Sequence, residues 1–235
     1  MCGRVAMFTP PGRLARLLEA SLAAGVEPEG VTHWNIGPQR TLFALTELDG
    51  ERILDRYRWG LLPSWAKDPS ISNRLFNARA ETVSEKPSFR SAFSKRPCVV
   101  AVDGFYEWDH REGRLKQPHY FTRGDGDTLL FAGLFEHWRD HALGDDAPVV
   151  ATCTVITTTP NDDMDSIHDR MPVVLERDAI DLWLDTTETQ RELRHELLRP
   201  APAGTLTHYG VSSAVGNVRN DGPELIAPSE SNSLF

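Results

Sequence analysis

The sequence predicts an α+β fold, with mixed, curved or barrel-like β-sheets flanked by several helices in a single domain. The length of 235 residues suits one domain of ordinary size. Apolar runs of strand length, rich in β-branched and aromatic residues, dominate the chain. Helical patterns stand between groups of these runs without the regular alternation of a parallel βαβ sheet, so an α+β arrangement is favoured.

The predicted strands are bounded by turn residues. Segments 41–47 and 52–63 are expected to pair around the turn Leu-Asp-Gly-Glu. One buried strand is expected over 98–108, and Pro160 ends the β-branched run 149–160. The other expected strands are 118–123, 128–138 and 171–176.

An amphipathic helix is predicted over 11–23, because four leucines recur there at helical spacing. These are Leu14, Leu17, Leu18 and Leu22. Further helical segments are expected at 86–93, 179–186 and 190–198. Residues 1–226 are expected to form the ordered core of the domain, and 227–235 a flexible tail.

The composition excludes several classes of protein. No apolar run approaches the ~20 residues of a membrane span, and no export signal is visible, so a cytoplasmic location with no membrane partner is expected. Three cysteines form neither a disulfide framework nor a zinc-ligand spacing. The histidines form no ligand-spaced cluster, so neither a metal nor an organic cofactor is expected.

The formal net charge is −9, from 25 basic and 34 acidic residues, which argues against a nucleic-acid partner if only the total counts. The distribution is more informative. Between Arg74 and Arg96, six basic residues stand against two acidic ones. This stretch indicates a locally basic face on an acidic protein, and a solvated helix with internal charge pairs is the alternative.

Cys2, in the opening Met-Cys-Gly-Arg, differs from the other cysteines. Cys98 and Cys153 lie in apolar strands and are interpreted as buried hydrophobic residues. A chain terminus is rarely buried, so we do not expect this role for Cys2. Removal of Met1 would place its thiol beside a free α-amine, and both groups have nucleophilic forms accessible near neutral pH.

A 1,2-aminothiol suits an aldehyde substrate. The amine condenses with the aldehyde to an imine, and the adjacent thiol closes a five-membered thiazolidine in an intramolecular step. The competing interpretation is an N-terminal nucleophile hydrolase, in which the thiol attacks an amide and the amine acts only as a base.

Other polar residues interrupt apolar segments, and each has a functional and a structural interpretation. Glu107, next to Trp108 in a strand of aromatics, is a general acid–base candidate or a surface glutamate. His168 is a candidate for proton transfer in imine chemistry, because histidine side chains ordinarily titrate near neutral pH, or it is a loop histidine paired with Asp169. Asn77 orients a substrate oxygen or is a turn amide. Arg79 binds phosphate or belongs to a surface ion pair.

Six motifs taken together are far more specific than any one of them. In chain order they are MCGR, WNIGP, NARAET, DGFYEW, IHDRMP and VGNVRNDGPEL. They resemble the SRAP family, the abasic-site processing proteins once called SOS-response-associated peptidases, over almost the whole chain. The resemblance implies a damage-response sensor of abasic sites in single-stranded DNA that forms a thiazolidine crosslink through its mature N-terminal cysteine.

The resemblance also implies roles for single residues. Glu107 is the acid–base group, His168 supports the intermediate and its reversal, and Asn77 holds the Cys2 end and the sugar. The same site, or general methionine removal, would release Met1. The remaining implied residues contact DNA: Arg79, Arg170 and Arg4 bind phosphate, Pro38 and Trp65 wedge against or stack on bases, and Trp108 supports that wall.

Two other functions remain open at this point. An N-terminal cysteine amidase or peptidase would have no need of the DNA-contacting set, and a noncovalent reader of single-stranded DNA would have no need of the aminothiol. The expected partner is single-stranded DNA containing abasic sites, and we expect a monomer.

Overall fold

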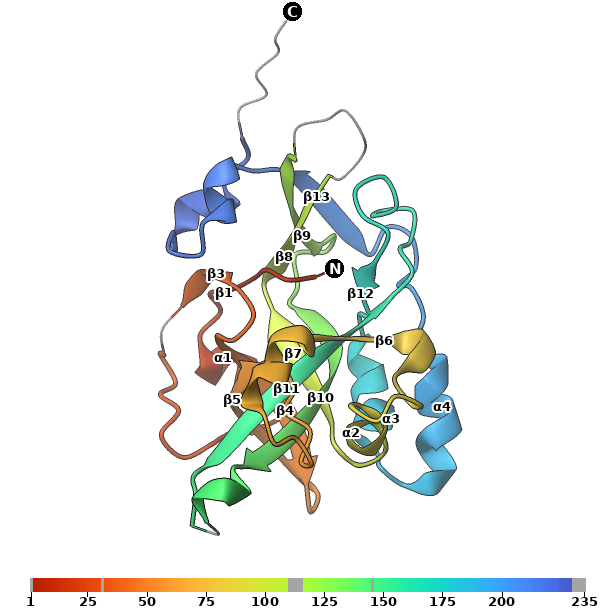
Figure 1. The fold of residues 1–235 in the computed structure, drawn as a ribbon. Helices are drawn as coiled ribbons and strands as arrows, with labels where there is room; N and C mark the ends of the chain where they lie inside the picture. The colour runs from red at the N-terminus through yellow and green to blue at the C-terminus, as the bar shows by residue number, and fades with distance from the viewer. Residues whose placement is uncertain (1, 31, 110–115, 145, 230–235) are drawn as a thin grey trace, which may run out of the picture.

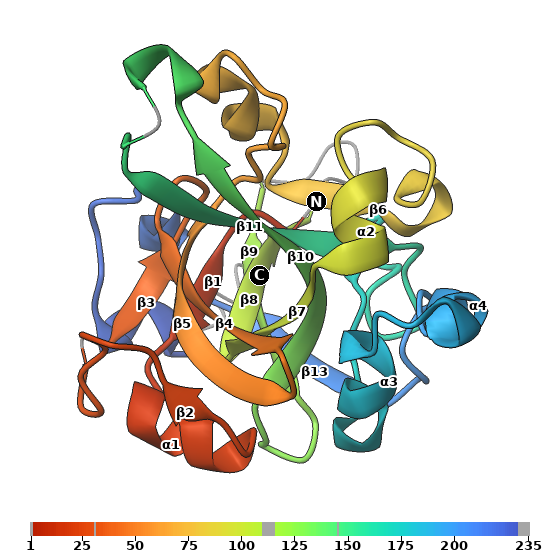
Figure 2. The ribbon, with the colours of Figure 1, turned by 90° about the horizontal axis from the view of Figure 1, so that it is seen from below.

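Five strands close into a barrel at the centre of the molecule (Figures 1 and 2). The structure is a computed structural model, and it describes residues 2–30, 32–109, 116–144 and 146–229. Neighbouring barrel strands are antiparallel except β5 and β11, whose parallel pairing closes the ring. In order around the ring the strands are β4 (Thr41–Leu48), β5 (Glu51–Trp59), β11 (Val149–Thr158), β10 (Leu129–Arg139) and β7 (Pro97–Val102).

A second sheet covers one end of the barrel, above it in Figure 1. Its strand order is β13–β9–β8–β1–β3, with antiparallel neighbours. These strands are β1 (Val5–Met7), β3 (His33–Ile36), β8 (Gly104–Trp108), β9 (Pro118–Arg123) and β13 (Leu206–Gly210). One apolar core runs from the barrel interior to this sheet, where Phe105 and Phe121 stack at 4.9 Å and Phe105 contacts Phe131 of the barrel.

Helices cover the outer face of the barrel and bury a second apolar cluster there (Figure 2). They are α1 (Pro11–Leu17), α2 (Arg90–Lys95), α3 (Ile180–Leu184) and α4 (Arg191–Glu196). Short 3₁₀ segments complete the chain: η1 (Pro69–Arg74), η2 (Ala80–Thr82), η3 (His141–Leu143), η4 (Arg177–Ala179), η5 (Glu188–Gln190), η6 (Ser213–Gly216) and η7 (Pro223–Ile226). Over the described ranges, no helix reaches the length and apolarity that a membrane span needs.

Three short strands extend the barrel sheet. They are β2 (Ser21–Leu22), β6 (Asn77–Arg79) and β12 (Met171–Pro172). β6 runs parallel to the last part of β11, while β12 pairs antiparallel with its end. The C-terminal end of β11 therefore lies between the segments that carry the NARAET and IHDRMP motifs.

The predicted α+β class with barrel-like sheets is confirmed, and two of its elements need correction. The helix expected over 11–23 ends at Leu17, because Glu19 has a positive φ of 53° and the chain then pairs with β5 as β2. The single strand expected over 98–108 is two strands, since the chain leaves the barrel at Asp103 and enters the second sheet at Gly104.

The other boundaries differ less. The helices expected at 86–93 and 190–198 are displaced by a few residues, to α2 and to η5 with α4, and only the first two residues of the 171–176 strand pair with β11. The tail expected from residue 227 is still paired at its start, since Ser229 donates to the Gly210 carbonyl at 2.8 Å. The remainder of that tail, 230–235, lies outside the described residues.

The passage from the barrel to the second sheet requires glycine at 104. A methyl group added there would lie 2.4 Å from the Tyr120 ring and 2.6 Å from the Phe121 carbonyl oxygen. Because this backbone sits between packed strands, we expect Gly104→Ala to lower the free energy of unfolding by about 1–3 kcal/mol in urea titrations. Gly216→Ala is the matched control, since a methyl group there meets no atom within 4 Å; equal effects of the two would contradict this account.

Candidate active site at the N-terminal cysteine

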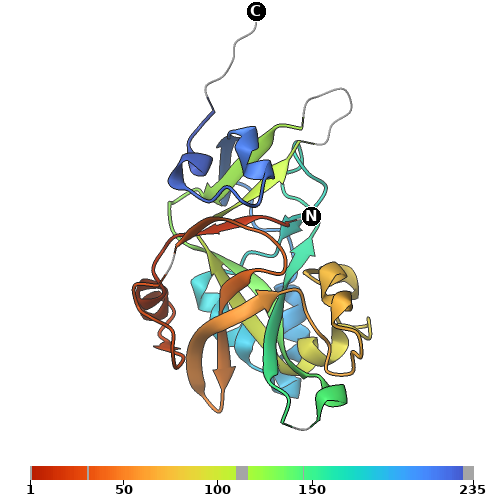
Figure 3. The same cartoon turned by 60° about the vertical axis from the view of Figure 1, so that its left-hand side comes forward.

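Cys2 is buried between the two sheets. Its exposed fraction is 0 %, contrary to the expectation from its terminal position. The Asn77 side chain on β6 donates a hydrogen bond to the Cys2 carbonyl at 2.6 Å, and the N-terminal segment, residues 2–7, lies at the junction of the barrel and the second sheet (Figure 3). Burial, followed by the nearby Glu107 carboxylate, raises the pKa of the Cys2 thiol, so the resting thiol is protonated at neutral pH.

Glu107 lies on β8, the strand that pairs with β1 of the N-terminal segment. The Tyr106 amide donates to the Arg4 carbonyl at 2.9 Å, which continues the β1–β8 pairing toward Cys2. Glu107 is 3 % exposed, and burial raises the pKa of its carboxyl group from 4.5 to about 7. A carboxyl group with this pKa is both a proton donor and a proton acceptor near neutral pH.

His168 reaches the same place from the segment between β11 and β12. Its Nε2 lies 3.8 Å from Glu107 Oε2, and its side chain is 9 % exposed. The Arg170 amide donates to His168 Nδ1 at 3.0 Å, so in the neutral ring Nδ1 accepts and the Nε2 proton faces Glu107. In the protonated ring Nδ1–H can bind Asp169 Oδ1, also at 3.0 Å.

The four predicted catalytic residues therefore come from four elements and meet at the end of β11. Asn77 Oδ1 is buried without a hydrogen-bond partner among the described residues, which leaves an acceptor for a substrate hydroxyl or an amine. A thiol near a carboxyl group that titrates near 7, with an imidazole 3.8 Å from that carboxyl group, can add a nucleophile to a carbonyl carbon and move the protons that this addition requires.

The arginines of the two flanking motifs have different environments. Arg79 is exposed on β6, two residues beyond Asn77. Arg170, expected to contact phosphate, is instead 8 % exposed and pairs through both terminal nitrogens with Glu81, at 2.5 and 2.9 Å. It also donates to the Thr157 carbonyl at 2.6 Å, so it fixes η2 to β11 beside the site.

Arg4 is likewise engaged within the protein. Its NH1 group donates to Asn35 Oδ1 at 2.8 Å and to the Val215 carbonyl at 2.7 Å, and its guanidinium lies 5.8 Å from the centre of the Trp108 ring. Asn35 donates in turn to the carbonyls of Val215, Asn217 and Asn220. Asn35 thereby ties the WNIGP motif to the VGNVRNDGPEL motif.

The two residues expected to touch bases are on loops. Pro38 is half-buried between β3 and β4. Trp65 is 55 % exposed, and its indole N–H donates to the Pro87 carbonyl at 3.3 Å. The basic stretch that precedes β7 is mostly exposed, whereas Arg96 pairs with Glu136 at 2.8 Å. Its exposed members are Arg74, Arg79, Lys86, Arg90 and Lys95.

Sequence reasoning missed the residues that hold this site together. Glu81 follows Arg79 in the NARAET motif and Asn35 precedes Pro38 in WNIGP, but neither received a role. An acidic residue inside a basic stretch was the available signal for Glu81. Nothing in the order of residues pairs Glu81 with Arg170, which lies 89 positions away.

The fold and site define an α+β barrel protein in which a buried cysteine, the second residue, lies near a carboxyl group, and an imidazole lies 3.8 Å from that carboxyl group. The sequence profile of the SOS response associated peptidase (SRAP) family matches residues 1–218. The chain belongs to this family.

Named relatives cover nearly the whole chain. It is 37 % identical over 228 residues to the abasic site processing protein YoqW of Bacillus subtilis, covering 96 % of this chain and 99 % of that protein. It is 34 % identical to the abasic site processing protein HMCES of Gallus gallus, with 98 % and 78 % covered, and 31 % identical to YedK of Escherichia coli, with 97 % and 100 % covered. A crystal structure of a Bacteroides thetaiotaomicron protein shares the fold with a TM-score of 0.83 at 22 % identity, over 97 % of this chain and all of that one.

The pKa of Glu107 makes stability depend on pH. The raised pKa means that between pH 4.5 and about 7 the folded protein keeps a proton that the unfolded chain releases, so stability falls as the pH rises through this window. Relative to the parent, we expect Glu107→Gln to have an equal free energy of unfolding near pH 4 and a higher one, by ~3 kcal/mol, near pH 8 in urea titrations.

Glu85→Gln is the matched control, because Glu85 is exposed on the basic stretch. A difference between the parent and Glu107→Gln that stays constant across the pH range would contradict the raised pKa of Glu107.

Proposed function

We propose that this protein processes abasic sites in single-stranded DNA by forming a thiazolidine crosslink between its mature N-terminal Cys2 and the aldehyde of the ring-opened abasic sugar. The observation that carries the proposal is the burial of Cys2 near Glu107, whose carboxylate oxygen lies 3.8 Å from His168 Nε2. The relatives named abasic site processing proteins support the choice of substrate. We further propose that the protein is a monomer in the cytoplasm, that it associates with the nucleoid when it is bound to damaged DNA, and that it acts in the damage response.

Hydrolysis of the Met1–Cys2 peptide bond must come first, because an acylated nitrogen cannot form an imine. In the proposed route the Cys2 thiol gives up its proton to the Glu107 carboxylate and attacks the Met1 carbonyl. The C–N bond to Cys2 then breaks as Glu107 returns this proton to the Cys2 nitrogen, which leaves Met1 bound as a thioester of Cys2. Water then hydrolyses the thioester, which releases methionine and returns the thiol. The net reaction consumes one water molecule and leaves the α-amine of Cys2 free.

The amine then adds to the aldehyde. The abasic sugar opens when its hydroxyl proton is transferred to the ring oxygen, an isomerisation that an acid–base group assists. The Cys2 nitrogen forms a bond to the aldehyde carbon, and the resulting carbinolamine loses water when Glu107 protonates the departing hydroxyl. Asn77 Oδ1 is the acceptor that orients the sugar, and the Nε2 proton of His168 favours the carboxylate that Glu107 becomes.

Ring closure uses the thiol. The sulfur adds to the imine carbon, the C=N double bond becomes a single bond, and the thiol proton reaches the nitrogen through Glu107. No atom is oxidised or reduced, and the two steps together release one water molecule. Closure is intramolecular with both groups on one residue, which favours it entropically.

DNA binding is assigned in the proposal to the surface around this site. Arg79 supplies a cation next to the catalytic group, and the exposed basic stretch extends it despite the net charge of −9. Trp65 and Pro38 would contact bases, with Trp108 and Arg4 behind them. Arg170 is committed to Glu81 and is proposed to position the site as well as to attract phosphate through its charge.

The crosslink is the first measurement to make. A single-stranded oligonucleotide with one abasic site, incubated with the Met1-free protein, should give an adduct that survives boiling in detergent and is seen by gel and intact mass. Cys2→Ala should give no such adduct. Cys2→Ser should give only an imine that borohydride traps, because the amine remains and the ring-closing thiol is lost.

A heat-stable adduct from Cys2→Ser would contradict the thiazolidine. The absence of any adduct from the parent, with its amine shown to be free, would favour an N-terminal cysteine amidase. Retained affinity without an adduct would favour a noncovalent reader of single-stranded DNA.

Binding and chemistry should separate between Arg79 and Glu107. Arg79→Ala should weaken binding and reduce the slope of log K against log salt by about 0.7, the value for one contact to a single strand. Glu107→Gln should slow crosslinking and leave affinity and salt slope unchanged. Arg13→Ala, an exposed arginine on α1, is the control; an unchanged salt slope in Arg79→Ala would exclude a phosphate contact.

A further inference from the structure

The turn that leads to His168 carries an acidic cluster to which the proposed chemistry gives no role. Its backbone is held by consecutive turn hydrogen bonds. The Met164 and Asp165 amides donate to the Asn161 carbonyl, at 3.0 and 2.9 Å, and the His168 amide donates to the Met164 carbonyl at 3.0 Å. The side chains of Met164 and Ile167 are buried in the core that the barrel shares with the second sheet. Hydrogen bonds through Met164 therefore join Asn161 to His168.

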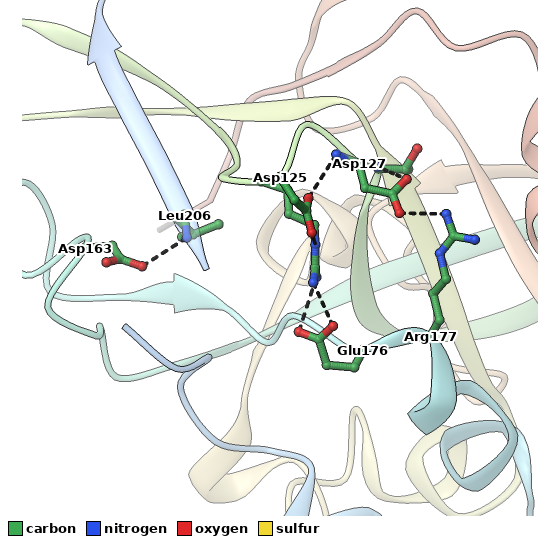
Figure 4. Close-up of polar contacts among 8 residues, drawn as sticks. Asp125, Asp127, Asp163, Glu176, Arg177 and Leu206 are labelled. Atoms are coloured by element: carbon green, nitrogen blue, oxygen red, sulfur yellow. Dashed lines mark hydrogen bonds and ion pairs between the residues drawn. The ribbon is translucent and has the colours of Figure 1, made fainter. Parts of the chain in front are cut away.

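One carboxylate of the cluster attaches this turn to the second sheet. Asp163 accepts hydrogen bonds from the Gly204 amide at 2.8 Å and from the Leu206 amide at 3.0 Å, and the Leu206 contact is drawn in Figure 4. The Asn161 side chain donates to Asp163 at 3.0 Å and to the Ala201 carbonyl at 3.1 Å. The neighbouring Asp162 and Asp165 are exposed.

This attachment joins the two halves of the site. His168 belongs to the chain that leaves barrel strand β11, whereas Glu107 belongs to β8 in the second sheet. Leu206 begins β13, which pairs with β9, and β9 pairs with β8 so that His119 lies directly opposite Glu107. The carboxylate of Asp163 therefore holds the His168 turn to the sheet that carries Glu107.

The ion pairs nearby do not replace this attachment. Arg123 binds Glu176 at 2.7 Å and Arg177 binds Asp127 at 2.6 Å, and Glu176, Arg177 and Asp127 lie to the right of Leu206 in Figure 4. These pairs join the end of β9 and the β9–β10 turn to the segment after β12. The Glu176 side chain is 50 % exposed in the first pair, and the Arg177 side chain is 52 % exposed in the second. Such exposed pairs contribute little, whereas the bonds of Asp163 go to backbone amides of fixed geometry.

We propose that Asp163 is a positioning residue of this active site, which holds His168 Nε2 at Glu107 by tying the turn 161–168 to the start of β13. The expected effect of Asp163 on the crosslinking rate rests on the proposed function. Its expected effect on the position of His168 relative to Glu107 does not.

The kinetic test compares Asp163→Ala with its exposed neighbour in Asp162→Ala. At saturating abasic oligonucleotide, Asp163→Ala should lower the crosslinking rate constant about tenfold, and Asp162→Ala should leave it unchanged. Affinity for a tetrahydrofuran abasic analogue, which has no aldehyde and cannot crosslink, should stay within about twofold in both variants, because DNA contacts are made elsewhere. Asp163→Asn keeps one acceptor oxygen, so its crosslinking rate constant should lie between those of Asp163→Ala and Asp162→Ala. This variant provides the test if Asp163→Ala folds poorly.

A double-mutant cycle shows whether Asp163 acts through His168. In a His168→Gln background, Asp163→Ala should cause no further loss of rate, because the side chain that it positions is already absent. A second, multiplicative loss in that background would overturn the proposal. So would equal rates for Asp163→Ala and Asp162→Ala.

A measurement without DNA separates this proposal from the proposed function. The ring resonance of His168, assigned by its disappearance in His168→Gln, should shift on Glu107→Gln in the otherwise unchanged protein. The same Glu107→Gln change should leave that resonance unmoved when Asp163→Ala is present. A shift that persists in Asp163→Ala would overturn the positioning role even if the protein crosslinks DNA. If the parent forms no crosslink, this coupling still decides the role of Asp163.

Discussion

The docking of residues 2–7 at the junction of the barrel and the second sheet is the constraint on which the candidate site depends. The hydrogen bond of 2.6 Å from Asn77 to the Cys2 carbonyl fixes one side of this segment, and strand pairing with β8 fixes the other. At this junction Cys2 is 0 % exposed and Glu107 is 3 % exposed, and burial raises the pKa of both side chains.

The raised pKa values divide the chemical roles. Glu107, with its pKa near 7, exchanges protons under conditions in which the Cys2 thiol does not ionise by itself. In the proposed mechanism the thiol becomes a nucleophile only when it transfers its proton during attack, which would confine its reactivity to a substrate already held in the site. Elsewhere the protein uses paired charges: Arg170 neutralises Glu81, and the pKa of the Glu81 carboxyl is lowered by that hydrogen bond.

Much of the fold could be predicted from the sequence, and the failures have physical causes. Alternation and β-branching located the barrel strands because those signals are local. The division of 98–108 was missed because apolar residues lie on both sides of Asp103, although the Asp-Gly pair at 103–104 is a typical turn signal. The early end of α1 had no signal either, since leucine spacing in Leu18 and Leu22 suits a helix, but Leu22 reaches the core from β2.

The site was predicted as a set of residue types, whereas its geometry depends on contacts between distant segments. Asn77 and Cys2 are 75 positions apart, Arg4 and Val215 are 211 apart, and Asp163 and Leu206 are 43 apart. In each case a side chain binds a backbone group, so position rather than side-chain identity defines one partner, and no sequence pattern marks it. The free-energy cost of closing loops over such separations is offset by the packed core. The candidate site is therefore a property of the completed fold, because the groups around Cys2 come from distant parts of the chain.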